Sequence, residues 1–237
     1  MPAEVARPTF VLASGSPARL RLLRQAGLTP EVMVSGVDEE AIERAMAGDP
    51  VPEVALALAR AKARAVAPST PAQALVLGCD SIFEVDGVRL GKPPSAGEAL
   101  LRWQLMRGRA GTLHTGHWLI DRATGIEVGE TVSTVVEMSD VDDAEIAAYI
   151  STGEPLEVAG GFTLDGLGAP YVAGVVGDPG NVIGVSLPAV RRLAGRCDRT
   201  GRRSDPGGPL SATGPLSRGA GGAAQRQQAD DQPAGRP

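Results

Sequence analysis

The stretch LASGSPAR, residues 12–19, predicts the end of a strand, a tight turn and the start of a helix. Apolar residues precede the turn, Ser16 stands where the helix would have its N-cap, Pro17 would be its first residue, and Gly27 would end it. Backbone N–H groups and the helix dipole favour an anion at such a helix start, and Arg19 lies close by. The segment is therefore a candidate phosphate-binding turn, with an ordinary capped helix as the alternative.

Strand and helix patterns alternate along most of the chain. Strands are predicted for Thr9–Leu12, Glu31–Ser35, Ala74–Asp80, Gly111–Asp121, Ile126–Glu137, Gly161–Leu164 and Tyr171–Gly177. Helices are predicted for Ala18–Ala26, Val51–Ala67, Ser95–Arg107, Asp142–Thr152 and Val182–Ala194. Between them, Asp86-Gly87 is a strong hairpin signal. This alternation predicts a mixed α/β domain with helices on both faces of its sheet.

Composition sets the size of the core and the class of protein. The chain has 237 residues, of which 43% are hydrophobic, enough for one core plus a tail. We expect residues 1–196 to fold and residues 197–237, rich in Gly, Pro, Ser, Ala, Arg and Gln, to form a disordered tail. A net charge of −5 argues against nucleic-acid binding, and no run approaches the roughly 20 apolar residues of a membrane span. Two cysteines without metal-type spacing, and no signal-peptide pattern, indicate a cytoplasmic protein.

Two further charged residues stand at positions typical of a ligand site. Asp80 follows the apolar run of a predicted strand, where a carboxylate commonly faces the ligand of an α/β protein, although it is as often a turn cap. Lys92 lies between Gly91 and Pro93 on a constrained loop. Its ammonium group is a point charge suited to phosphate, with a solvated loop lysine as the alternative.

Acidic residues 38–40 and Lys62 offer a second set of charges. The acidic trio, which includes Glu39, provides oxygen ligands for a hard divalent cation, or it begins a helix with favourable dipole electrostatics. Lys62 is flanked by alanines on a predicted helix, so its backbone can approach a neighbour closely. His114 and His117 are three residues apart on a predicted strand, which places them on opposite faces and disfavours a shared metal.

Five segments resemble, in order, the motifs of the Maf family, septum-formation-inhibitor-like nucleoside triphosphate pyrophosphatases. They are LASGSPAR (12–19), GCDS (78–81), LGKP (90–93), EPLEVAG (154–160) and NVIG (181–184). The resemblance covers nearly all of the predicted domain and none of the tail. It implies a Maf/ITPase-like mixed twisted sheet with a deep nucleotide-binding cleft. It also implies hydrolysis at the α-phosphate to nucleoside monophosphate and pyrophosphate, removal of modified or non-canonical nucleotides from the pool, and a possible homodimer.

The resemblance also implies roles for individual residues. Asp80 matches the general base, and Glu39 with Asp80 would hold a divalent metal, Mg²⁺ or Mn²⁺. The residues matching the triphosphate-binding groups are Ser14, Ser16, Arg19, Lys62 and Lys92. The positions at which subfamilies differ in base preference are Ala18, Ser81 and Asp165.

This sequence departs from the family pattern at three positions near the expected site, one of which is Gly111, where a histidine is common. Ala18 stands where many members have a second arginine, and Val158 stands where they have a lysine. The sequence therefore leaves open a non-catalytic, nucleotide-sensing module linked to cell-division control. An interaction protein that acts through the arginine-containing tail is a third reading.

Overall fold

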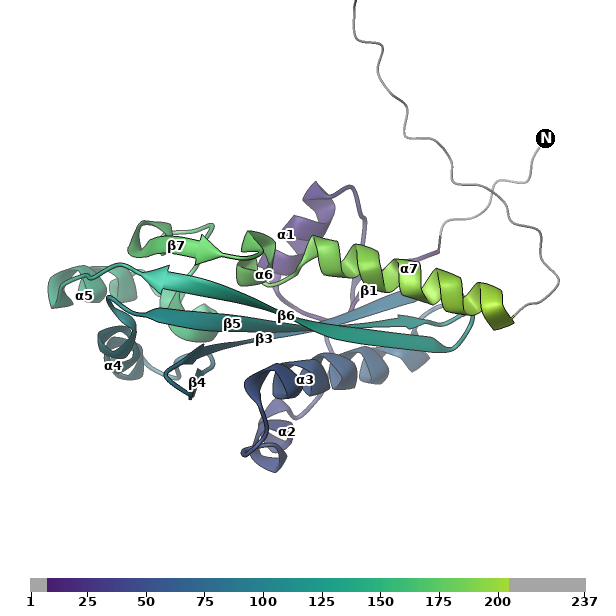
Figure 1. Cartoon of the computed structure of the whole chain (residues 1–237), viewed down its shortest axis with the longest axis horizontal. Helices are drawn as coiled ribbons and strands as arrows, with labels where there is room; N and C mark the ends of the chain where they lie inside the picture. Colours follow the sequence, from purple (N-terminus) through teal and green to yellow (C-terminus); the bar gives the residue numbers. More distant parts are fainter. Residues whose placement is uncertain (1–7, 205–237) are drawn as a thin grey trace, which may run out of the picture. The chain divides into compact units, whose positions relative to one another are not determined.

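A computed structural model describes residues 8–204, which form a mixed sheet with helices on both faces (Figure 1). The strand order is β2-β1-β3-β5-β6-β7, with β4 beside β3. Strands β1, β2 and β3 run parallel to one another, and the remaining pairs are antiparallel. The strands are β1 (Phe10–Leu12), β2 (Glu31–Val32), β3 (Leu75–Val85), β4 (Val88–Leu90), β5 (Ala110–Asp121), β6 (Ile126–Met138) and β7 (Val172–Val176). The predicted α/β class is confirmed.

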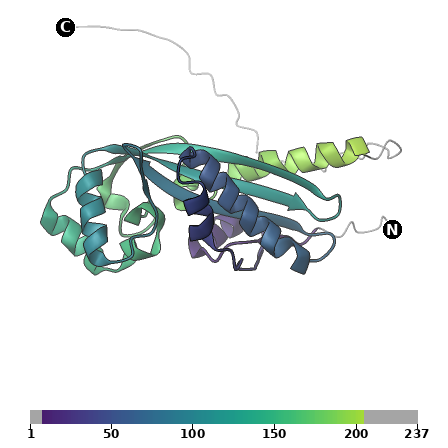
Figure 2. The same ribbon diagram turned by 90° about the horizontal axis from the view of Figure 1, so that it is seen from below.

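The helices form two layers on the long strands and a separate group at one end. On one face lie α1 (Pro17–Gln25), α6 (Pro179–Ile183) and α7 (Leu187–Ser204). On the other face lies α3 (Val51–Val66), with α2 (Glu39–Ala45) beside it. Helices α4 (Ala96–Met106) and α5 (Asp143–Ser151) pack at the far end (Figure 2). Short 3₁₀ turns cover Ala67–Ser69, Glu154–Glu157, Ala159–Gly161 and Ala169–Tyr171.

Helix α3 packs unusually close to the sheet because glycines lie beneath it. A Cβ atom at Gly78 of β3 would lie 2.1 Å from the carbonyl oxygen of Ala59. A Cβ at Gly116 of β5 would lie 2.2 Å from the carbonyl oxygen of Ala55. The alanine-rich face of α3 therefore rests directly on the backbones of two strands, as the sequence around Lys62 predicted.

Several predicted elements differ from the structure; the strand predicted for Glu31–Ser35, for example, ends at Val32. Residues 161–164 do not form a strand, because Gly160 and Gly161 have positive φ angles of 74° and 70° that turn the chain instead. The helix predicted for Val182–Ala194 is two helices, α6 and α7. They are separated at Gly184, whose φ is 131° and which ends α6.

Helix α7 also extends past the domain boundary expected at residue 196. It continues through Ser204, and Cys197 is only 2% exposed in a cluster with Leu193 and Leu77. The helix therefore runs past the expected boundary into residues whose composition alone suggests a tail, and the boundary itself stays a prediction. The rest of the predicted tail, residues 205–237, lies outside the described residues. Among residues 8–204, no helix has the length and apolar character needed to cross a membrane.

Candidate active site

The candidate site lies where one edge of β3 loses its neighbouring strand. Strand β1 pairs with β3 only as far as Leu77, because the chain turns away into α1, and β4 pairs with β3 only from Phe83. Neither strand pairs with β3 residues 78–82 along this edge. Asp80 lies in the middle of this gap. Its expected position at a strand end or turn is wrong, since β3 continues to Val85 against β5.

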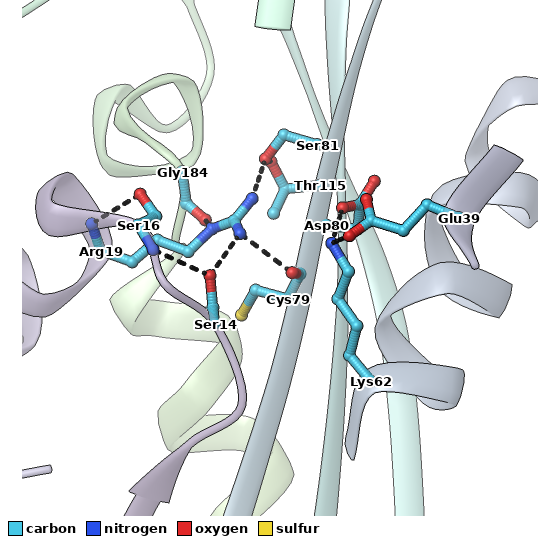
Figure 3. Close-up of polar contacts among 10 residues, drawn as sticks. All are labelled: Ser14, Ser16, Arg19, Glu39, Lys62, Cys79, Asp80, Ser81, Thr115 and Gly184. Carbon is cyan, nitrogen blue, oxygen red and sulfur yellow. Dashed lines mark hydrogen bonds and ion pairs between the residues drawn. The ribbon is translucent and has the colours of Figure 1, made fainter. Parts of the chain in front are cut away.

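On the α3 face of this gap, Lys62 joins two carboxylates (Figure 3). Its Nζ lies 2.5 Å from Oδ1 of Asp80 and 2.9 Å from Oε1 of Glu39. Lys62 and Asp80 are only 7% and 8% exposed. Glu39 begins α2, whose N-cap is Asp38. The helix alternative therefore holds, since the acidic trio starts α2, and Glu39 also faces the buried lysine; ligation of a cation by the trio stays a prediction.

The surroundings of Asp80 act on its acidity in opposite directions. Burial raises the pKa of Asp80, the charges of Lys62 and Arg19 lower it, and the net shift is upward. Glu43, one helical turn beyond Glu39, has a pKa raised by burial and by the charges on Asp80 and Glu39. Sequence analysis missed Glu43, although its i, i+4 spacing from Glu39 on a helix would have placed both on one face.

On the opposite face, Arg19 is a buried cation bound by neutral oxygens (Figure 3). Its Nε donates to the carbonyl of Gly184 at 2.8 Å, and Nη1 donates to Ser14 Oγ at 2.9 Å and to the Cys79 carbonyl at 3.0 Å. Its Nη2 donates to Ser81 Oγ at 2.9 Å. No carboxylate pairs with Arg19 among the ion pairs of residues 8–204. A buried positive charge without a counterion favours an anionic ligand.

The sequence also singled out Ser16, Ala18 and Lys92 as candidate site residues. Ser16 caps α1, its hydroxyl accepting from the backbone N–H of Arg19 at 3.4 Å, and Ala18 lies partly buried in the first turn of α1. Lys92 is exposed in the loop after β4. The structure thus brings Ser14, Arg19 and Ser81 together on one face, and Glu39, Lys62 and Asp80 together on the other. Contact of Lys92 with either set stays a prediction.

Glu154 organises the glycine-rich loop that follows the 3₁₀ turn Ala159–Gly161. Its carboxylate accepts hydrogen bonds from Thr163 Oγ1 at 2.5 Å and from the backbone N–H of Gly168 at 3.0 Å, with further donors at Tyr149 and Leu167. Burial raises the pKa of Glu154, but these hydrogen bonds outweigh burial and lower it overall. Asp165 on this loop forms an ion pair with Arg21 of α1. The predicted specificity position is therefore attached to the helix that carries Arg19.

The two histidines point to opposite faces of β5, as their spacing predicted. His114 hydrogen bonds Ser133 Oγ at 2.8 Å and Glu84 Oε2 at 3.1 Å. His117 is fully buried on the other face, where its Nε2 accepts from the backbone N–H of Ser186 at 2.9 Å. Burial, with the charge of Arg19, lowers the pKa of His117 to about 4. The two rings therefore have separate sets of partners on the two sides of the sheet.

The carboxylate side of the site offers the kind of oxygen donors that a divalent cation would use. Asp80 and Glu39 supply hard oxygen donors on either side of Lys62. The ammonium group of Lys62 provides the positive charge that both carboxylates contact. No cluster of three or more ligand-type side chains with metal geometry occurs within the described part of the chain. Mg²⁺ is commonly held by one or two carboxylates together with substrate phosphates, so this donor set suits a cation that arrives with a phosphorylated ligand.

Fold and site together define an α/β protein with a buried arginine bound only by neutral oxygens on one face of a strand and a lysine-bridged carboxylate pair on the other. The family model described as Maf-like protein matches residues 9–197. The chain belongs to the Maf family.

Relatives from several bacteria match most of the described chain. A nucleoside triphosphate pyrophosphatase of Streptomyces coelicolor is 60% identical over 189 residues, covering 79% of this chain and 89% of that protein. A protein of the same name from Salinispora tropica is 51% identical, covering 78% and 81%. The solved nucleoside-triphosphatase / dITP/XTP pyrophosphatase of Mycobacterium abscessus aligns at 15% identity with a TM-score of 0.36, covering 83% of this chain and 96% of that one.

Proposed function

We propose that this chain hydrolyses nucleoside triphosphates to a nucleoside monophosphate and pyrophosphate. The observation that carries the proposal is the pairing, across one strand, of the uncompensated Arg19 with the Asp80–Lys62–Glu39 group. One side offers a cation for phosphate oxygens, and the other offers a carboxylate for a proton. The name shared by relatives at 51–60% identity supports the same reaction.

The α1 side of the gap would bind and orient the triphosphate. Arg19 and the hydroxyls of Ser14 and Ser81 already share one hydrogen-bonded network. Because these donors are held in place before the substrate arrives, little reorganisation is needed when they meet phosphate oxygens. The start of α1 adds its dipole and backbone N–H groups, and Ser16 and Lys92 would contribute at the edges of the same site.

Asp80 would act as the general base. Its carboxylate would accept one proton from a water molecule as the water oxygen bonds to the α-phosphorus and the bond to the pyrophosphate oxygen breaks. The raised pKa of Asp80 suits this task, because a base works best when its pKa approaches the working pH. Lys62, bonded to Asp80 and Glu39, would hold both carboxylates in a fixed arrangement.

Glu39 and Asp80 would also hold a divalent cation, Mg²⁺ or Mn²⁺, together with the substrate. When bound, such a cation neutralises phosphate charge and promotes the loss of a proton from water. Lys62 already places one positive charge between the same carboxylates. Dependence on the added metal is therefore a further part of the proposal.

Base preference would be set around Ala18, Ser81 and Asp165. The ion pair with Arg21 neutralises and orients the carboxylate of Asp165, and Ser81 is already held by Arg19 and Thr115. Removal of modified or non-canonical nucleotides in the cytoplasm, by a homodimer, is the biological setting that the family resemblance suggests.

The first experiment measures pyrophosphate release from a panel of canonical and modified nucleoside triphosphates, with Mg²⁺, Mn²⁺ or Co²⁺. We expect metal-dependent release by the wild type and a loss of roughly 10²–10⁴-fold in Asp80→Asn. Asp86→Asn is the matched control, because Asp86 is exposed at the hairpin turn and Asn tolerates its φ of 48°. Saturable nucleotide binding without release by the folded wild type would contradict the enzyme and favour the nucleotide-sensing module.

A further inference from the structure

Helix α2, which carries Glu39, is attached to the protein by few contacts. None of the residues of α2 is buried, and only Ile42 and the adjacent Met46 are partly buried, against an apolar cluster of α3 and β3. One side of the helix borders an open hollow of about 460 Å³ lined by Glu40, Glu43, Arg44, Ala47 and Arg89. Apolar packing alone therefore holds this helix weakly.

Arg89 of β4 provides a polar attachment at the end of α2. Its Nη1 and Nη2 each donate to the carbonyl oxygen of Met46 at 3.1 Å, and Nη2 also donates to the carbonyl oxygen of Asp49. Met46 is the C-cap of α2, and its carbonyl, which also accepts from the backbone N–H of Asp49 at 3.1 Å, lies at a helix end where no intrahelical donor reaches it. A cation at this end also complements the helix dipole.

The chemistry of this contact requires an arginine. The planar guanidinium presents several N–H donors in a fixed fork, so one side chain can bind two carbonyls at once. A lysine would bring the same charge but without this forked geometry. Arg89 reaches across from the hairpin of β3 and β4, 43 residues along the chain from Met46.

The opposite end of α2 is held by Lys62 through Glu39. Seven residues of helix span only about 10 Å and behave as a short rod. Anchoring the C-terminal end of such a rod limits the directions in which its first residue can move. The two cations, Lys62 and Arg89, therefore fix the two ends of the helix.

We propose that Arg89 is a positioning residue for Glu39: it clamps the C-terminal end of α2 to β4 and so keeps Glu39 beside Lys62 and Asp80. This inference rests on the proposed function, in which Glu39 helps to hold the cation. The same contact links α2 to β4, the strand that precedes the loop with Lys92.

A double-mutant cycle tests whether Arg89 acts through Glu39. We expect Arg89→Gln to lower kcat/KM about tenfold and to raise the metal concentration needed for half-maximal activity, with an unchanged melting temperature. Arg89→Lys should recover only part of this loss. In a Glu39→Gln background, Arg89→Gln should change kcat/KM less than twofold. Equal losses in both backgrounds would overturn the proposal.

Arg44→Gln is the matched control, because Arg44 is an exposed arginine of the same helix that pairs with Glu40. It should leave kcat/KM within twofold of the wild type. A loss as large as that of Arg89→Gln would show that any charge change on α2 lowers activity, and would overturn a specific role for the clamp.

Amide hydrogen exchange provides a second measurement that needs neither metal nor turnover. We expect the amides of residues 39–49 to exchange at least tenfold faster in Arg89→Gln than in the wild type or Arg44→Gln, with β5 and β6 unchanged. Unchanged exchange in residues 39–49 would overturn the clamp. If the wild type releases no pyrophosphate, the proposed function fails, and hydrogen exchange still decides whether Arg89 holds α2.

Discussion

At the scale of single residues, Lys62 determines how Asp80 titrates. Burial alone raises the pKa of Asp80, and the charge and hydrogen bond of Lys62 oppose that rise. In Lys62→Met we therefore expect the pKa of Asp80 to rise further. Because Asp80 must be deprotonated to accept a proton, the acid limb of the kcat/KM profile should move to higher pH. Activity at the optimum should fall roughly 10–100-fold.

The pH profile of pyrophosphate release checks this expectation. Arg64→Met is the control, because Arg64 lies on the same helix but pairs with Glu127 at its exposed surface. Its acid limb should coincide with that of the wild type. An acid limb that stays in place in Lys62→Met would contradict the role of Lys62.

His117 makes the folded protein sensitive to acid. Its pKa is lowered from 6.5 to about 4, so the unfolded chain binds a proton more readily than the folded one. The stabilising contribution of the neutral ring is complete above pH 6.5 and is lost as the pH falls toward 4. That loss amounts to about 3 kcal/mol, and protonation also removes the acceptor used by the Ser186 N–H.

Urea unfolding of the wild type and of His117→Gln at pH 7 and pH 4 measures this contribution. The variant should be less stable at pH 7 but should lose less stability on acidification. Because all other titrating groups are shared, the difference between the two curves isolates His117. Parallel curves would show that the ring is protonated equally in both states.

At the scale of elements, the close packing of α3 on the sheet positions Lys62. Gly78→Ala would place a Cβ against the backbone of Ala59, so α3 must shift away from β3. We expect a destabilisation of about 3 kcal/mol and a clear drop in kcat/KM, since Lys62 moves relative to Asp80. Melting temperature and pyrophosphate release measure the two effects.

Gly48→Ala is the matched control for this substitution. No heavy atom lies within 4 Å of a Cβ at Gly48, so the change should alter stability by less than about 0.5 kcal/mol. A wild-type melting temperature in Gly78→Ala would show that α3 adjusts without strain.

Strands with a long, regular alternation of apolar and polar residues could be predicted from the sequence. The ends of elements that depend on pairing with another strand could not. β5 and β6 differ from their predicted bounds by one residue, because long alternating runs carry a strong local signal. β3 runs five residues beyond Asp80 because its pairing with β5 continues to Glu84. The same pairing explains why Asp80 lies within a strand rather than at its end.

At the scale of the whole molecule, the end of α7 sets the length of chain that the fold needs. A truncated protein of residues 1–204 should keep the melting temperature and activity of the full chain, since the family match ends at residue 197. A protein of residues 1–196 should lose about 2 kcal/mol of stability, because it lacks Cys197 and the end of α7. Thermal unfolding of the two truncated proteins makes the comparison. Equal melting temperatures would place the boundary at residue 196 after all.

The sequence by itself determined the class of fold, the capped turn into α1 and the identity of nearly every candidate residue. These features depend on neighbours along the chain, through hydrophobic period, N-cap chemistry and glycine spacing. The same local information indicated that Lys62 lies on a helix able to approach another backbone, which the contacts of Gly78 confirm.

Only the tertiary structure decided how these residues meet. The gap beside β3, the two carboxylates on Lys62 and the four neutral acceptors around Arg19 all join segments distant in the sequence. The same holds for the Arg89 contact at the end of α2. Such contacts depend on strand register and on how closely a helix packs. The free energy of packing over the whole domain selects both, and no local pattern encodes them.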